Sequence, residues 1–303
     1  MNERLNVGGQ AVIEGVMIIG PGHYSIAVRN GKKIIAKSWK LKKGNHRLLK
    51  LPFVRGFANL ARMLAIGIKS LVWSAQQAGQ EDEKIGKHEL GFAVLTAFLF
   101  AVAVFIALPY FLTSLIGLTE ESKPLLFNLV DGIIRILIFL AYLAVISLMK
   151  DVKVLFEYHG AEHKAIHCYE KGRKLTVENV GRFTTLHPRC GTSFLLTVFI
   201  VGILVFSVIP SLILYLNPDF LQLGFWTRKI LLLAVRLAMV PVIAGISYEI
   251  LKLSDKKQHN VLFRIVSAPG ILLQKITTRE PSYRQIEVAI ASLKTLLETE
   301  NKK

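Results

Sequence analysis

The segment 157–170 holds the residues whose types and spacing could do chemistry. It contains the pattern H-x-x-E-H at His159, Glu162 and His163, followed by His167 and Glu170. A helix turns about 100° per residue, so these three histidines and two carboxylates would share one face. Two histidines at i and i+4 can ligate one Zn²⁺ ion or a similar divalent metal, and a neighbouring Glu can take a proton from a metal-bound water.

This pattern is the signature of the inverted zincins, a class of metallopeptidases. The sequence therefore predicts a metal site with His159, His163 and His167 as candidate ligands and Glu162 as the general base. The plainer alternative is a solvated helix face that happens to be rich in histidine.

A metal site needs a further protein ligand, and two places offer one. His187 and Cys190 lie on the same side of the predicted membrane, just before the third apolar run. Glu249 lies near the end of the fourth run, and inverted zincins commonly take a downstream Glu. A closed His/Cys set without an open position would make the site structural instead of catalytic.

Three further charges fall inside apolar runs, where an ionisable group is costly and is a functional candidate. Asp131 and Arg135 stand at i and i+4 and should pair. Arg236 lies at a similar depth in another run, so a buried cluster of the three is expected. It would be a polar clamp between helices or, alternatively, a polar path for a substrate or ion.

The elements that must position these residues are mostly membrane helices. Of the 303 residues, 52% are hydrophobic, and four runs reach the roughly 20 residues that a span requires. They cover 91–118, 125–149, 194–216 and 230–251. The flanking segments carry 33 of the 38 Lys and Arg residues, which predicts a multi-pass protein of the inner or plasma membrane with cytoplasmic termini.

The net charge of +17 is explained by this bias and by attraction to anionic membrane lipids. No basic motif with interleaved aromatic residues suggests specific nucleic-acid recognition. With only two cysteines, the chain is not a disulfide scaffold.

The expected fold class is a mainly α, polytopic membrane protein with a small cytoplasmic sheet and amphipathic interfacial helices. A Val/Ile-rich run at 11–19 and two segments flanking Asn30-Gly31 predict three strands. The helix expected over 53–78 lies on the inner leaflet or packs on the cytoplasmic domain. The segment 261–276 is too short to cross and is expected to be interfacial or re-entrant, and 281–299 predicts a soluble helix.

These elements divide the chain into six parts in order. They are a β-rich region (1–50), an amphipathic helix and linker (51–90), two spans (91–149), a His-rich metal-binding segment (150–193), two further spans (194–251) and an interfacial segment with a final helix (252–303).

Five motifs together resemble a known family. They are GGQAVIEGVM at 8–17, HGAEHK at 159–164, HPRCGTSF at 187–194, SYE at 247–249, and PG at 269–270 leading to TREP at 278–281. The set is similar to the bacterial YqhQ family, integral membrane proteins of unknown function described as predicted metal-dependent enzymes. The resemblance points to Glu14, His159, Glu162, His163, His187, Cys190 and Glu249. Glu14 is then either a site residue or a residue that anchors the sheet.

Three functions fit these patterns. The first is a membrane-embedded, metal-dependent hydrolase, with zinc as the expected cofactor, acting on a peptide or lipid-linked substrate at the cytoplasmic membrane surface. The second is a scaffold or accessory factor with a structural metal site, whose partner is a membrane complex or the ribosome. The third is a transporter or channel that uses the intramembrane charges and, with only four spans, requires a homo-oligomer.

Overall fold

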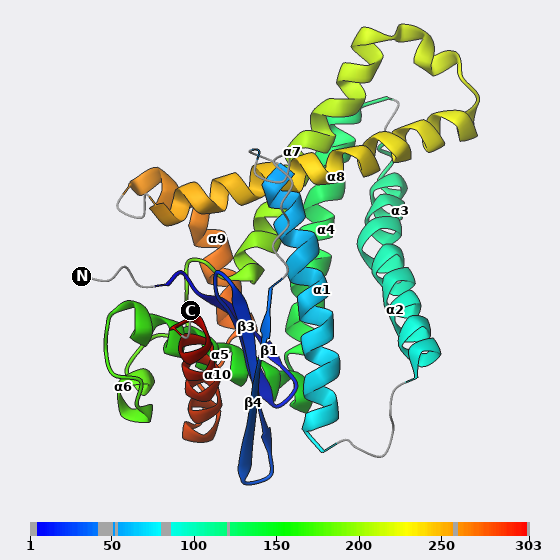
Figure 1. Cartoon of the computed structure of the whole chain (residues 1–303). Coiled ribbons are helices and arrows are strands. Elements are labelled where there is room, and N and C mark those ends of the chain that lie inside the picture. Colours follow the sequence, from blue (N-terminus) through cyan, green and yellow to red (C-terminus); the bar gives the residue numbers. More distant parts are fainter. Residues whose placement is uncertain are drawn as a thin grey trace.

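The computed structural model describes residues 5–41, 51, 54–79, 86–119, 122–256 and 260–301. They form two parts (Figure 1). The first part, the sheet unit, consists of β1 (Gly8–Val12), β2 (Gly15–Ile19), β3 (His23–Asn30), β4 (Lys33–Lys40), α1 (Val54–Gln77), α5 (Lys150–Glu170), α6 (Val177–Gly181) and α10 (Tyr283–Asn301). The second, the membrane bundle, consists of α2 (Lys87–Val102), the π-helical turn η2 (Ala103–Ala107), α3 (Leu108–Leu115), α4 (Pro124–Ile146), α7 (Gly191–Leu216), the 3-10 turn η3 (Pro218–Gln222), α8 (Phe225–Lys256) and α9 (Val261–Thr277).

The sheet is antiparallel, with four strands in the order β1-β2-β3-β4. The expectation of three strands was wrong, because the Val/Ile-rich run folds back on itself at Ile13 and Glu14. Glu14 has a φ of 50°, which L residues rarely adopt, and this places Val12 opposite Gly15. The predicted hairpin is confirmed, but its two-residue loop is Gly31-Lys32 instead of Asn30-Gly31, because Asn30 pairs with Lys33. Gly31 has a φ of 57°.

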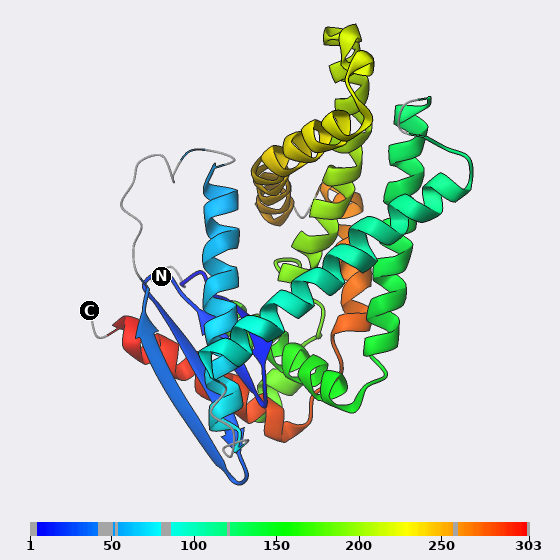
Figure 2. The same cartoon turned by 90° about the vertical axis from the view of Figure 1, so that its right-hand side faces the viewer.

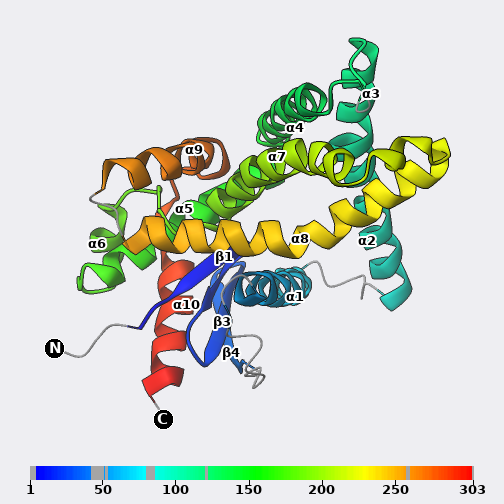
Figure 3. The ribbon, with the colours of Figure 1, turned by 90° about the horizontal axis from the view of Figure 1, so that it is seen from above.

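The sheet unit has three layers. On one face, Val12, Met17, Ile26 and Val28 form a core with Ile66 of α1. The opposite face packs on α5 and α10 through a larger core of apolar residues: Val16, Ile18, Ala27, Tyr158, Ala161, Ala165, Ile286, Ala289 and Leu293. Figure 3 shows the sheet between α1 and α10. Because strand side chains alternate between faces, each face of the sheet contributes to a separate core. Helices cover both faces.

Four helical segments among the described residues are long and apolar enough to cross a membrane. They are Gly91–Leu115, Pro124–Ile146, Gly191–Leu216 and Trp226–Ser254. The four predicted spans are thus confirmed to within a few residues at most ends, and the chain is a polytopic membrane protein. The bundle stands beside the sheet unit, and the first and last described elements, β1 and α10, both belong to that unit (Figure 2).

The helix predicted over 53–78 is confirmed as α1, which packs on the sheet and on α8. Its Gly56 approaches Gly245 and Tyr248 of α8 so closely that a Cβ would lie 2.8 Å from a Tyr248 side-chain atom. Apolar side chains of α1 nevertheless remain exposed: Val54, Phe57, Leu64, Ile68 and Leu71. The segment 261–276 forms α9, a helix that packs on α7.

The charges within the spans form the predicted polar cluster. Arg135 Nη2 donates to Asp131 Oδ2 at 2.7 Å, one helical turn away on α4. Arg236 of α8 reaches the same region, where its Nη2 donates to Asn128 Oδ1 at 3.0 Å. Asn128 was not a predicted member of this cluster, and its side-chain amide links α4 to α8.

Candidate functional site

Helix α5 carries the H-x-x-E-H pattern between the sheet and the bundle. Its apolar side, with Cys168, packs into the core of the sheet unit. On another side Gly160 meets the segment after α9, where Arg279 N donates to Phe156 O at 2.9 Å. A Cβ at Gly160 would collide with the carbonyl oxygen of Arg279, so glycine allows this close approach.

Two histidines of α5 meet a cysteine from a different helix. The candidate ligand atoms of His159, His163 and Cys190 all lie within 4.8 Å of one another. His159 Nε2 lies 3.2 Å from Cys190 Sγ. In a tetrahedral zinc site a nitrogen and a sulfur ligand are about 3.6 Å apart, given the usual bond lengths. The three side chains therefore fit a metal of this kind.

The tautomers of both histidines also suit ligation. His159 Nδ1 donates to Thr277 O at 2.8 Å, and His163 Nδ1 donates to Thr185 O. A carbonyl oxygen only accepts, so each Nδ1 must carry a hydrogen, and in the neutral imidazole Nε2 then keeps its lone pair. Metal-ligating histidines are usually oriented by such a bond from the other ring nitrogen.

Cys190 occupies the N-cap of α7. Its sulfur lies 3.1 Å from Thr192 Oγ1 and accepts from Thr192 N at 3.4 Å. The positive end of the helix dipole and these donors favour a negatively charged group at this position. Since the thiolate is the form that binds metals, the N-cap position is suited to a ligand.

Glu162 lies beside the trio, the name used below for His159, His163 and Cys190. This glutamate is only 3% exposed. Its Oε2 is 3.4 Å from His163 Nε2 and 3.9 Å from His159 Nε2. Burial raises the pKa of Glu162 above its ordinary value, and burial lowers the pKa of His163, which favours a neutral imidazole able to ligate. A raised carboxyl pKa is typical of groups that exchange protons near neutral pH.

His167 and His187 form a second group with Glu170, in which the candidate ligand atoms come within 4.8 Å of one another. Here the ring nitrogens are largely engaged. His167 Nε2 donates to Leu186 O at 2.8 Å. His187 Nε2 donates to Glu170 Oε2 at 3.3 Å, while its Nδ1 accepts from Arg189 N at 3.2 Å. This group therefore orders the segment before α7, and burial lowers the pKa of His167 to about 4.

Glu249, the other candidate ligand, lies apart from both groups. Its carboxylate accepts from Arg55 Nε at 2.7 Å and from Arg55 Nη2 at 2.6 Å, so it joins α8 to the start of α1. Glu14 is also remote from the trio, and its Oε2 accepts from Tyr158 Oη at 3.1 Å. That contact ties the β1–β2 turn to α5 and favours the sheet-anchoring alternative for Glu14.

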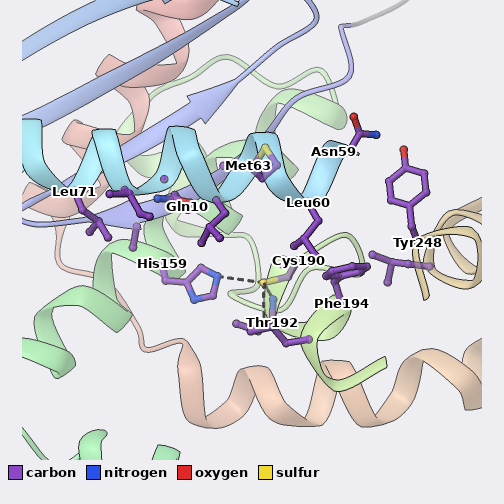
Figure 4. Close-up of a pocket in the computed structure, with 18 of the residues that line it drawn as sticks. Gln10, Asn59, Leu60, Met63, Leu71, His159, Cys190, Thr192, Phe194 and Tyr248 are labelled. Atoms are coloured by element: carbon purple, nitrogen blue, oxygen red, sulfur yellow. Dashed lines mark hydrogen bonds between the residues drawn. The ribbon is translucent and has the colours of Figure 1, made fainter. Parts of the chain in front are cut away.

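A groove of about 570 Å³ opens beside the trio. It runs between α1, β1, α5, the start of α7 and the end of α8, and both His159 and Cys190 line it (Figure 4). Most of its walls are apolar, and Gln10, Asn59 and Thr192 supply polar groups. Glu162 and His163 line a smaller pocket that shares Cys190 with the groove. The groove is thus a route to the candidate metal site.

Sequence reasoning missed the groove and the residues that orient the trio. Thr185 and Thr277 act through backbone carbonyls, which leave no trace in residue type. Thr192 had a signal, since it lies two residues after a cysteine at the start of an apolar helix.

A four-span bundle with a buried His/Cys/Glu cluster defines a class of polytopic membrane protein with a candidate metal centre. Residues 51–299 match a family described as "Protein of unknown function (DUF1385)". The chain is also 36% identical to "Uncharacterized protein YqhQ" of Bacillus subtilis (strain 168), over 97% of this chain and 92% of that protein. The chain belongs to this family of uncharacterised membrane proteins. No solved structure matches it.

Proposed function

We propose that this protein is a metal-dependent hydrolase that acts on a peptide or lipid-linked substrate at the cytoplasmic surface of the membrane. One observation carries the proposal. His159, His163 and Cys190 converge on one point at the edge of an apolar groove, and the carboxylate of Glu162 stands beside them. Three protein ligands leave one position of a tetrahedral metal open, as catalytic zinc sites require.

The residues of the chain have distinct tasks in such a reaction. A bound zinc ion would act as a Lewis acid and lower the pKa of a coordinated water. Glu162 accepts the proton of the attacking water and passes it to the leaving group as the ester or amide bond breaks. The hydrogen bonds from His159 and His163 to backbone carbonyls fix the two imidazoles. The groove holds the apolar part of the substrate and excludes bulk water.

The distribution of Lys and Arg residues indicates on which side of the membrane the sheet unit lies. Lys and Arg residues are concentrated in the segments that build the sheet unit and its connections, whereas the loops 119–124 and 217–229 carry only three. Positively charged loops remain in the cytoplasm, so the sheet unit and both termini are cytoplasmic in this proposal. The metal centre then faces the cytoplasm near the anionic inner leaflet.

Hydrolysis is preferred over a structural metal site because the trio is open on one side. His159 and Cys190 line the groove, whereas a structural zinc site is closed by four protein ligands. Neither the scaffold role nor transport through the bundle has a comparable supporting feature among the described residues.

The test compares the zinc-loaded Glu162→Gln variant with the zinc-loaded wild type, both in detergent or in nanodiscs. Zinc is measured by mass spectrometry, and hydrolysis with a quenched-fluorescent peptide library and with fluorogenic acyl esters. We expect the variant to keep its zinc and to lose at least about a hundredfold in hydrolysis, the size of a general-base contribution. Glu178→Gln, which removes an equal charge from the exposed start of α6, is the matched control.

Equal hydrolysis by Glu162→Gln and the wild type would overturn the assignment of Glu162. Full zinc binding with no hydrolysis of any probe would favour the structural site and a scaffold role.

A further inference from the structure

Strand β1 is an edge of the sheet, and its register shows which backbone groups face outward. In a two-residue hairpin the residues flanking the turn, here Val12 and Gly15, form a hydrogen-bonded pair. Such pairs alternate along an antiparallel ladder, so Gln10 and Gly8 also bond to β2. The N–H and C=O groups of Gly9 and Ala11 therefore point away from the sheet.

The outward groups of β1 differ in their partners. Further along the same edge, Ile13 N donates to Ser74 Oγ of α1 at 3.1 Å, which closes that end. The outward groups of Gly9 and Ala11 form no hydrogen bond with any residue in the described ranges. Both residues line the groove. A strand edge with free backbone groups is a template for another strand.

The free part of this edge begins beside the proposed acid/base. A Cβ at Gly9 would lie 2.9 Å from both Cγ and Oε1 of Glu162, so only glycine lets β1 approach the carboxylate this closely. A chain paired with Gly9 would thus lie in the groove beside His159 and Cys190, next to the part of β1 that contacts Glu162.

The walls of the groove also fit a strand. A strand added to β1 would continue the sheet, and its side chains would alternate between the two faces. On the α1 side the groove presents Leu60, Leu64 and Ile68, and on the α5 side it presents Leu155 and Phe156. Both faces are therefore apolar, and part of the α1 wall is uncovered, with Leu64 63% exposed.

We propose that the groove binds an extended, apolar polypeptide segment as a fifth strand on the outer edge of β1. Its backbone pairs with Gly9 and Ala11, its side chains occupy the two apolar walls, and one of its carbonyls lies next to the trio of His159, His163 and Cys190. An acyl chain could fill the same volume, but it has no groups to satisfy the free donors and acceptors of β1. The inference rests on the proposed function, for which it names a peptide as the substrate.

The experiment measures binding, separately from cleavage, to full-length, zinc-loaded Glu162→Gln protein in nanodiscs. The probe is a fluorescein-labelled peptide of alternating leucine and threonine, roughly ten residues long, the upper length of a common strand. A second probe has the same sequence with every backbone amide N-methylated, which removes the donors from both edges of the strand and leaves the side chains unchanged. A lipid with a fluorescent palmitoyl chain is the third.

Two matched variants at Ala11 test the contribution of one backbone donor of β1. Ala11→Pro removes the outward N–H, and proline is tolerated on an edge strand where that group does not pair within the sheet. Ala11→Val enlarges the same side chain and keeps the N–H. Circular dichroism and zinc content establish that each variant is folded. We expect the plain peptide to bind at least tenfold more tightly than its N-methylated form, and Ala11→Pro to lose that advantage while Ala11→Val keeps it.

Equal affinity for the two peptides, or tight binding of the lipid probe alone, would overturn the inference. If Ala11→Pro fails to fold, the comparison of the two peptides on otherwise unmodified protein still decides it. Failure of the proposed function has a different signature, because the plain peptide would then bind in the β1-dependent manner without being cleaved by zinc-loaded wild-type protein.

Discussion

The Nε2 atom of His159 on α5 lies 3.2 Å from the Sγ atom of Cys190, the N-cap residue of α7, although the two residues are separated by 31 positions. The contact joins α5, which is part of the sheet unit, to the first turn of α7, which is a membrane span. A metal bound there would therefore link the sheet unit to the bundle as well as serve the proposed hydrolysis.

The first prediction concerns the ligands. We expect about one zinc ion per chain in the wild type and loss of nearly all of it in His163→Ala and Cys190→Ser, because each variant removes one of three ligands. His167→Ala, in the neighbouring group, should retain the metal. Mass spectrometry of detergent-purified protein measures this. Zinc lost from His167→Ala but kept by Cys190→Ser would assign the metal to the second group.

The second prediction uses the two cysteines. Cys168 is fully buried in the core of the sheet unit, whereas Cys190 lines the groove. After the metal is removed with a chelator, iodoacetamide should modify Cys190 several-fold faster than Cys168, because only a reachable thiolate reacts. Readdition of zinc should protect Cys190. In a Cys168→Ala variant, Cys190 is the only cysteine that iodoacetamide can modify. If zinc does not change the rate of this modification, Cys190 is not a ligand.

The third prediction is that Glu249 does not ligate the metal. Its carboxylate forms a bidentate ion pair with Arg55, so Glu249→Gln should retain the full zinc content of the wild type. The change should instead loosen the contact between α1 and α8, which limited proteolysis of α1 can detect. The exchange Arg55→Glu with Glu249→Arg should restore resistance to the protease. Loss of zinc from Glu249→Gln would return this residue to the ligand set.

The local part of the site could be predicted from the sequence. His159, Glu162 and His163 share one face because helical periodicity alone places them there, and Asp131 pairs with Arg135 for the same reason. The four spans could also be predicted from the sequence, because length and hydropathy define them. Each of these features depends only on residues close together in the chain.

The remaining features depend on packing between distant segments. Cys190 completes the trio only because the start of α7 meets α5, and sequence reasoning left it equal to His187 and Glu249. The fourth strand was missed because the turn after Val12 uses Glu14 at a positive φ, where glycine or asparagine would have been the usual signal.

The fourth prediction concerns Gly160. An added Cβ would collide with the carbonyl oxygen of Arg279, a backbone atom that cannot move without displacing the segment after α9. We expect Gly160→Ala to destabilise the protein by about 3 kcal/mol, the upper part of the usual range for overpacking. Gly191→Ala is the control, because nothing lies within 4 Å of a Cβ there. Apparent unfolding temperatures in detergent measure both, and equal temperatures would contradict the close approach.

The last prediction separates hydrolysis from transport through the bundle. Asp131 is 5% exposed, and its carboxylate accepts from Arg135. Arg135→Ala leaves a buried charge without this partner and should cost on the order of 3 kcal/mol. In Asp131→Asn with Arg135→Gln both charges are removed together, so most of that loss should be recovered. The cluster lies in the spans, whereas the trio lies where α5 meets the start of α7. The double variant should therefore keep its zinc and its hydrolytic activity. A stable double variant that binds zinc but has lost the cellular function would instead support a polar path through the membrane.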